Sequence, residues 1–145
     1  MFASEEDNAA FKNLLEAWAT DPEGMKDIFL KLSEKLMNKQ QTNLTFKARS
    51  GVSYSLRAAS VSNSENKRPL FVMVDVIDDD PESRWLSVCF YEDMITDPEG
   101  EGDLVPEGLL GEDGYCFDIY ESDQSLLSYI EERIDEAHAR ATGSV

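Results

Sequence analysis

The side chains in this sequence with the clearest chemical potential are clustered carboxylates. They form two groups, one in the turn 78–82 and one in the segment 97–103. The acidic residues of these groups are Asp78, Asp79, Asp80, Glu82, Asp97, Glu99, Glu101 and Asp103. Carboxylates this close together bind hard cations such as Ca²⁺, or they bind the basic side chains of a partner.

The second group partly matches a calcium-binding loop. Asp97, Glu99 and Glu101 occupy loop positions 1, 3 and 5, and Gly102 occupies position 6. Position 12 is Gly108, however, where a calcium loop has a bidentate Glu. We therefore expect a mobile acidic loop here and a solvated turn at 78–82, with no bound metal or other cofactor.

The sequence offers few groups for acid–base or nucleophilic catalysis. His138 is the only histidine, and neither a Gly-x-Ser-x-Gly motif nor a Gly-rich phosphate loop is present. Cys89 and Cys116 each lie in an apolar, strand-like run. We expect them to be buried free thiols in a reducing cytoplasm, with a disulfide between neighbouring strands as the alternative. No catalytic residue is predicted.

The charge of the chain is large and unevenly distributed. The net charge is −17, and residues 75–123 contain 17 Asp and Glu but only one basic residue, Arg84. The rest of the chain is nearly balanced. An acidic excess of this size opposes binding to nucleic acid and to anionic membranes. It favours a basic protein partner.

Two apolar runs, 70–77 and 84–91, organise the predicted fold. The turn 78–82 separates them, so they predict neighbouring antiparallel strands. The first run is apolar on both alternating faces, which indicates a central strand covered on both sides by helices or by a partner chain. Alternating polarity predicts a hairpin over 44–58 before these strands and a last strand over 115–120.

Apolar residues at helical spacing predict three helices. The first helix ends before Asp21, because the residue that precedes a proline disfavours the α conformation. Asp21 and Pro22 are expected to be the N-cap and first residue of the second helix. The last helix is expected to begin at Ser122 or Asp123.

These elements predict one α+β domain over residues 1–145. It contains an antiparallel meander sheet of about five strands, with two N-terminal helices and one C-terminal helix packed on it. Residues 1–8 and 142–145 are expected to be frayed.

The segment 92–114 is rich in Gly and Pro and is predicted to be a long loop. The apolar residues expected to attach its middle to the body are Leu104, Val105, Leu109 and Leu110. Long loops in compact domains are usually functional or mobile. An alternative function is therefore small-ligand binding or hydrolysis in a pocket under this loop, lined by Tyr91, Asp93 and Tyr115.

The favoured hypothesis is a non-enzymatic interaction module. It presents the acidic surface of residues 75–123 to a basic protein, as a chaperone, an adaptor or an inhibitor. The acidic N-terminus does not resemble a secretion signal and no apolar run reaches membrane-span length, which predicts a cytoplasmic location.

The protein is expected to be a monomer or a homodimer. Two chains of this charge repel each other, so a dimer would use the less charged hairpin or the N-terminal helices. An exposed edge strand at 44–49 or 115–120 would allow two copies to pair edge to edge.

Overall fold

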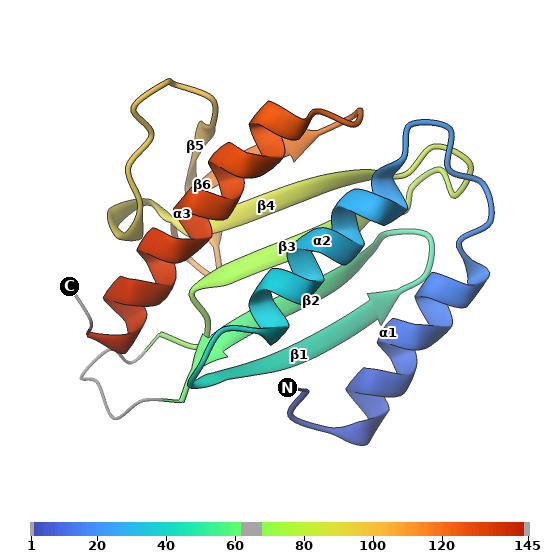
Figure 1. Ribbon diagram of the computed structural model, residues 1–145, viewed down its shortest axis with the longest axis horizontal. Helices are drawn as coiled ribbons and strands as arrows, with labels where there is room; N and C mark the ends of the chain where they lie inside the picture. Colours follow the sequence, from blue (N-terminus) through green and yellow to red (C-terminus); the bar gives the residue numbers. More distant parts are fainter. Residues whose placement is uncertain (1, 62–67, 144–145) are drawn as a thin grey trace.

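The computed structural model describes residues 2–61 and 68–143 (Figure 1). Two helices, α1 (Glu5–Ala17) and α2 (Met25–Met37), precede the sheet, and α3 (Gln124–Thr142) follows it. The fold is therefore α+β, with two N-terminal helices and one C-terminal helix, as predicted.

The sheet is antiparallel and has the strand order β1-β2-β3-β4-β6-β5. Its strands are β1 (Thr42–Arg49), β2 (Ser53–Ser60), β3 (Val72–Ile77), β4 (Trp85–Tyr91), β5 (Asp103–Leu109) and β6 (Glu112–Ile119). The first four form the predicted meander, and a short 3₁₀ helix, η1 (Glu92–Met94), follows them. The sheet has one strand more than the about five expected, because Asp103–Leu109, predicted to be part of a long loop, pairs with β6.

Capping side chains determine where the helices begin. Asp123 Oδ1 accepts a hydrogen bond from the Leu126 N–H at 3.1 Å, so α3 begins as predicted. Helix α2 begins at Met25, later than predicted. Its N-cap is Gly24, so the prediction of Asp21 and Pro22 as N-cap and first residue is wrong, although the Asp21 carboxylate accepts from the N–H groups of Met25 at 2.8 Å and Lys26 at 3.0 Å.

Residues 2–8 and 142–143, the described parts of the ends expected to be frayed, contact the rest of the fold or continue a helix. Phe2 forms a parallel bridge with Leu44, so the N-terminal segment lies beside β1. The Asp7 carboxylate accepts from the Phe46 N–H at 3.0 Å, which attaches α1 to the outer edge of β1. Thr142 is the last residue of α3, while residues 144–145 lie outside the described part of the chain.

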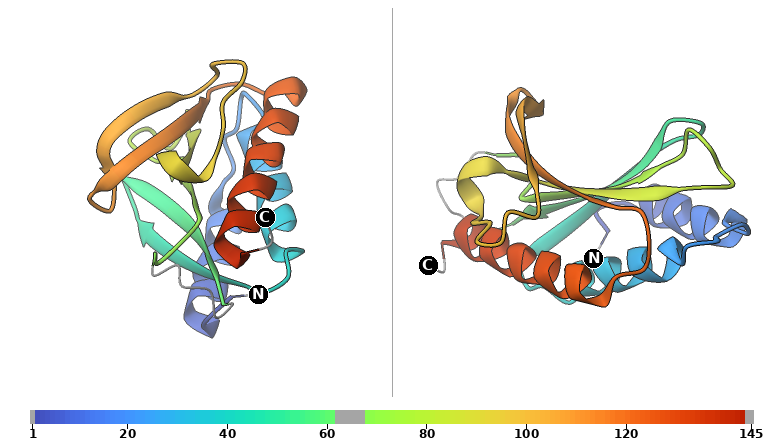
Figure 2. Two further views of the ribbon diagram at one scale, coloured as in Figure 1. Left: turned by 90° about the vertical axis from the view of Figure 1, so that its left-hand side faces the viewer. Right: turned by 90° about the horizontal axis from the view of Figure 1, so that it is seen from above.

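All three helices pack on one face of the sheet (Figure 2). The side chains that face them include a row of directly opposed, buried residues, Phe46, Leu56, Val74, Val88 and Phe117. No described helix lies on the other face. The prediction that helices cover both faces of the central strands is therefore wrong, and cover by a partner chain stays a prediction.

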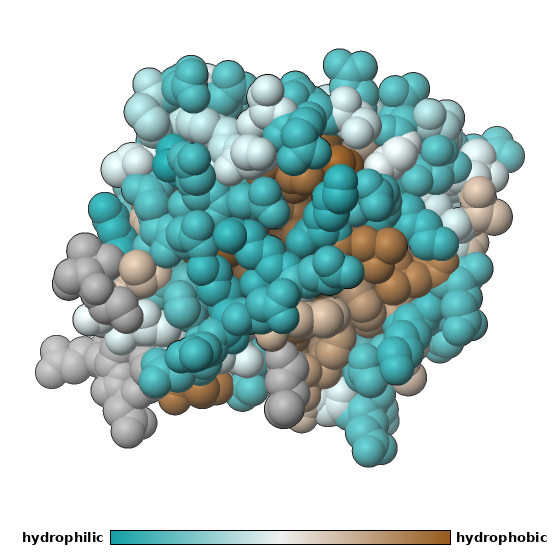
Figure 3. Space-filling view, in the orientation of Figure 1, coloured by the Kyte–Doolittle hydropathy of each residue, from teal (hydrophilic) through white to brown (hydrophobic). Residues whose placement is uncertain are grey.

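The outer surface of the helix layer is mainly hydrophilic, with an apolar strip visible between α1 and α2 (Figure 3). A hollow of ≈ 260 Å³ lies where α1 meets the ends of β1 and β2, and Leu14, Ala48 and Tyr54 are among its lining residues. Within the described residues, none of the helices combines the length and the apolar character needed to cross a bilayer.

Candidate functional site

Asp97 is the centre of a hydrogen-bond network that attaches its loop to the sheet and to α3. Its Oδ2 accepts from the Tyr115 hydroxyl at 2.7 Å and from the Gly102 N–H at 3.0 Å. Its Oδ1 accepts from the Glu101 N–H at 3.0 Å and from the Tyr129 hydroxyl. A β-carbon at Gly102 would lie 2.6 Å from Tyr115 Cε2, so only glycine lets the loop approach this closely.

The carboxylate of Asp97 is fully used by these donors. Burial acts to raise the pKa of Asp97, but the hydrogen bonds from Tyr129, Tyr115 and two backbone N–H groups outweigh burial and lower it to about 2. The described residues contain no group of three or more side chains that would hold a metal ion. Asp97, Glu99 and Glu101 are therefore not brought together as the calcium pattern suggested, and Asp97 has a structural role.

Asp78 also points inward, although the sequence places it on the acidic surface. It is 3% exposed, its Oδ1 accepts from Arg84 Nε at 2.7 Å, and its Oδ2 accepts from the Gly51 N–H at 2.8 Å. Burial acts to raise the pKa of Asp78, and the hydrogen bonds from Gly51 and Arg84 outweigh it and lower the pKa. Asp78 thus joins the β1–β2 turn to the β3–β4 turn, and the other acids of 78–82 are exposed.

Arg68 is an important residue that the sequence analysis missed. Its guanidinium donates to both carboxylate oxygens of Asp93, at 2.6 and 2.9 Å, and to Glu112 Oε1 at 2.7 Å. It also lies 4.2 Å from the centre of the Tyr91 ring, which it covers. The hydrogen bond from Arg68 is the main cause that lowers the pKa of Asp93. The only signal in the sequence for the role of Arg68 is that this basic residue shortly precedes the acidic segment 75–123.

The three residues predicted to line a ligand pocket lie in different places. Tyr115 lines a hollow of ≈ 190 Å³ beside Asp97, and Asp93 lines a separate hollow of ≈ 160 Å³. Tyr91 is buried. Pockets for drug-sized ligands usually measure roughly 300–1,000 Å³. Both hollows are smaller than this, and the perturbed carboxylate beside one of them is held ionised by structural hydrogen bonds.

The β5–β6 hairpin exposes apolar side chains among acidic ones. Leu104, Val105 and Leu110 are 52%, 39% and 54% exposed, whereas Leu109 is buried. The prediction that all four attach the segment to the body is therefore right only for Leu109. The acidic residues exposed on this hairpin and on the loop before it are Glu99, Glu101, Asp103, Glu107, Glu112 and Asp113.

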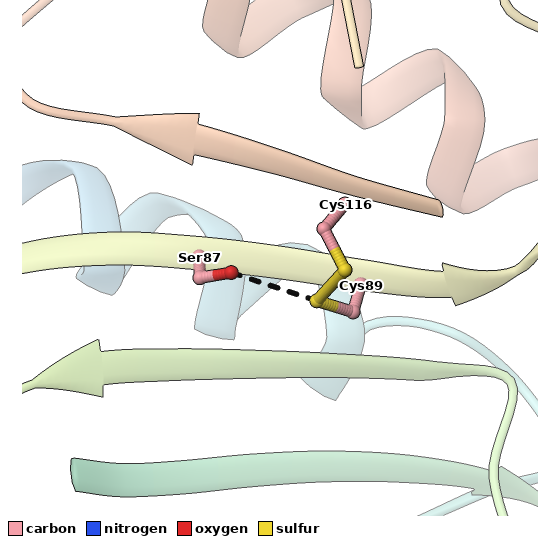
Figure 4. The surroundings of a disulfide bond; sticks show 3 residues. All are labelled: Ser87, Cys89 and Cys116. Carbon is pink, nitrogen blue, oxygen red and sulfur yellow. Dashed lines mark hydrogen bonds between the residues drawn. A yellow bond between two sulfur atoms is a disulfide. The ribbon is translucent and has the colours of Figure 1, made fainter. Parts of the chain in front are cut away.

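Cys89 and Cys116 are directly opposite each other on β4 and β6 and form a disulfide (Figure 4). Their Cα atoms are 4.2 Å apart, and the Ser87 hydroxyl lies 3.5 Å from Cys89 Sγ. The expectation of two free thiols is wrong, because the pairing of β6 with β4 brings the two side chains together. The disulfide lies on the face of the sheet that the helices leave uncovered.

Asp75 lies in the middle of the same uncovered face. In the register of the sheet it is opposite Ser55 of β2 and Ser87 of β4. Burial is the main cause that raises the pKa of Asp75, while the Ser55 hydroxyl and two nearby arginines act in the opposite direction. Among the described residues, its buried Oδ1 has no hydrogen-bond partner.

The acidic residues singled out in the sequence thus fall into two groups. Asp78, Asp93 and Asp97 hold turns and loops in place through hydrogen bonds and ion pairs. Asp79, Asp80 and the other exposed acids have side chains directed to solvent and available to a partner. No family model matches this chain, and no curated protein or solved structure is significantly similar to it.

Proposed function

We propose that this protein is a non-enzymatic interaction module. Its β5–β6 hairpin, together with the loop 95–102, binds a basic segment of a partner protein. The observation that carries the proposal is the exposure of Leu104, Val105 and Leu110 among acidic side chains. Carboxylates that served only solubility would not need large apolar side chains beside them, whereas a protein interface combines an apolar centre with a polar rim.

The two kinds of side chain have different roles in this proposal. The carboxylates attract a basic partner over distance and orient it, which raises the association rate at low salt. The apolar side chains lose water on contact and slow dissociation. The Asp97 network supports both roles, because it holds the loop against Tyr115 of β6 and Tyr129 of α3.

A capture experiment with matched variants tests the proposal. The immobilised protein captures partners from a lysate of its source, and bound proteins are eluted with a salt step and identified by mass spectrometry. The partner is then purified and titrated against each variant. We expect Glu101→Gln/Glu107→Gln to slow association about tenfold, because exposed charges act mainly on the association rate. Leu104→Ser/Leu110→Ser should instead accelerate dissociation.

The matched control is Glu16→Gln/Glu34→Gln. It neutralises two exposed acids on the helix layer and leaves the hairpin unchanged. A partner that binds the wild type and this control equally, but binds the hairpin variants weakly, supports the proposal. A partner that binds all four proteins equally would place the interface elsewhere, and a complete lack of a basic partner would refute the assignment.

A further inference from the structure

The centre of the uncovered face combines apolar side chains with a polar row, in which Asp75 lies between Ser55 and Ser87. Three rows of side chains cross this face, and the middle of each row falls on β3 and β4. The apolar residues and sulfur atoms at the centre are Met73, Ile77, Trp85, Cys89 and Cys116. Trp85 stacks on Tyr120 with ring centres 4.8 Å apart, and Tyr120 is 58% exposed. Aromatic, Met and apolar groups of this kind are enriched at the centres of protein interfaces.

The charges on this face are separated into two halves. On the β1–β2 side they are basic, with Lys47, Arg49 and Arg57. On the β6–β5 side they are acidic, with Asp118 and Asp103. Lys47 and Asp118 belong to one row of opposed residues that also contains Ser55, Asp75 and Ser87. The face therefore carries opposite charges on opposite sides of its centre, in which Asp75 lies among apolar side chains.

The two edges of the sheet are poorly suited to pairing with another chain. On β5, Pro106 lacks an N–H group and the pairing register with β6 is irregular. On β1, Phe2 pairs with Leu44, and Asp7 accepts a hydrogen bond from the Phe46 N–H. Strand β6, expected from the sequence as a possible edge, is interior. Association through the sheet must therefore use its face.

We propose that the uncovered face binds the same face of a second copy of this chain. The two copies are related by a two-fold axis that runs parallel to the strands, between β3 and β4. This axis places the basic β1–β2 half of each copy over the acidic β6–β5 half of the other. A two-fold axis perpendicular to the strands, lying in the interface, would instead place like charges together, so the charge pattern selects one of the two arrangements.

The shape and size of the face fit this arrangement. The sheet is twisted (Figure 2), and a twisted sheet rotated about an axis parallel to its strands stays roughly parallel to the original. Two such faces therefore pack in the aligned manner of a β-sandwich. Six strands about 4.8 Å apart and about 20–25 Å long give a footprint on the order of 600 Å². A standard interface buries about 800 Å² of accessible surface per partner, so this footprint is of the same order as that of a stable dimer.

The dimer also places a hydroxyl donor beside a carboxylate near its axis. Asp75 lies on β3 next to the proposed axis, and Ser87 lies opposite it on β4. The rotation therefore brings the Ser87 hydroxyl of each copy toward the Asp75 carboxylate of the other. That carboxylate has a buried oxygen without a hydrogen-bond partner among the described residues. A hydroxyl donor beside this carboxylate would offset part of the cost of removing it from water without adding charge.

Charge reversal on each half, followed by mixing, tests the proposal by sedimentation equilibrium over a range of protein concentrations. Lys47→Glu/Arg49→Glu reverses two of the three basic residues named on the β1–β2 side, and Asp103→Lys/Asp118→Lys reverses the two acidic residues named on the β6–β5 side. Each exchange changes the charge by two, so the first variant goes from −17 to −21 and the second to −13. We expect the wild type to be a dimer and each variant alone to dissociate about 100-fold more readily, because like charges then face each other. An equimolar mixture of the two variants should form a heterodimer.

The second of these variants gives the most decisive result. Its net charge of −13 is smaller in magnitude than the −17 of the wild type, so general repulsion alone would predict stronger self-association. The proposal predicts weaker self-association. The control Lys12→Glu/Lys31→Glu has the charge of the first variant, but its changes lie on the exposed side of the helix layer. It should remain a dimer. Circular dichroism confirms that each variant is folded.

The opposite outcomes would overturn the proposal. A wild type that is monomeric at every concentration would refute the dimer. A dimer that survives both reversals would use another surface, and a mixture that stays monomeric would show that the two halves do not face each other. Loss of the dimer in the helix-layer control would assign the effect to net charge. Asp103 and Asp118 belong to the β5–β6 hairpin, so partner binding by the hairpin is measured separately with Lys47→Glu/Arg49→Glu, which leaves the hairpin unchanged.

Discussion

At the scale of single residues, the environment of each carboxylate determines its role. Asp97 and Glu99 are two residues apart in the same acidic segment, yet Asp97 accepts four hydrogen bonds while the Glu99 side chain is exposed. The donors come from β6, from α3 and from the loop itself. A count of acidic residues therefore overstates the charge that this segment offers to a partner.

Replacement of Asp97 by Asn tests its structural role. The Asn side chain has a single acceptor oxygen, and its NH₂ group would face two of the donors that the carboxylate now accepts from. We therefore expect the free energy of unfolding to fall by about 2 kcal/mol at pH 7. The Asp97 pKa of about 2 lies below the usual unfolded value of about 3.9. The stabilisation by the carboxylate is therefore present above about pH 4 and lost as the pH falls toward 2.

Urea denaturation of wild type and Asp97→Asn between pH 7 and pH 2 measures this effect. The difference in stability between the two proteins should shrink as the pH falls through that window. Glu99→Gln, which removes an exposed neighbouring charge, serves as the control and should change stability by less than about 0.5 kcal/mol. A difference that is constant with pH would contradict the assigned pKa.

At the scale of elements, Asp78 attaches the β3–β4 turn to the β1–β2 turn through the Gly51 N–H, and a buried ion pair with Arg84 of its own turn holds its carboxylate in place. Arg84 and Asp78 have side chains 8% and 3% exposed, and Asp78 also accepts from the Gly51 N–H. Removal of one partner of a buried pair leaves the other charge buried and unpaired. The acidic turn, which reads in the sequence as a solvated loop, is thus part of the packing between two hairpins.

Asp78→Ala should lower the free energy of unfolding by about 3 kcal/mol or more, because Arg84 then lacks its counter-ion. Asp79→Ala in the same turn is the matched control, since its side chain is exposed, and should have an effect below about 0.5 kcal/mol. Thermal and urea unfolding of both variants give the comparison. Equal effects would show that the turn, not the buried pair, stabilises the hairpins.

At the scale of the whole molecule, the strand order combines with the charge distribution. Because β3 and β4 lie between the two hairpins, the acidic last hairpin is at the side of the sheet opposite the basic first hairpin. The separation of charge along the sequence thus becomes a separation across the sheet. The disulfide between Cys89 and Cys116 connects the meander to this last hairpin.

Reduction of the disulfide should destabilise the whole fold. The bond links residues separated by 27 positions, and a loop of this length restricts the unfolded chain by about 3–4 kcal/mol in the chain-entropy model. Urea denaturation with and without a thiol reductant measures the loss. Cys89→Ser/Cys116→Ser should match the reduced wild type and should not respond to reductant. A wild type that is equally stable in both conditions would contradict the prediction.

Much of the fold follows from local patterns in the sequence. The spacing of apolar residues from Phe11 to Trp18 predicts α1, and Asp123 predicts the start of α3. The two apolar runs around the turn 78–82 predict β3 and β4 in their correct pairing. These signals suffice because the periods of helices and strands, and the capping groups, are set by residues close together in the chain.

The tertiary structure alone decided the remaining features, because they depend on residues far apart in the chain. Strand β5 contains Gly, Pro and charged residues and lacks a strand pattern, and its pairing with β6 makes it a strand. The insertion of β6 beside β4 determined that Cys89 and Cys116 meet, and the packing of α3 brought Tyr129 to Asp97. The packing of all three helices on one face left the other face uncovered. The apolar character of both faces of β3 cannot specify this, because a side chain's position on a face does not determine what covers that face.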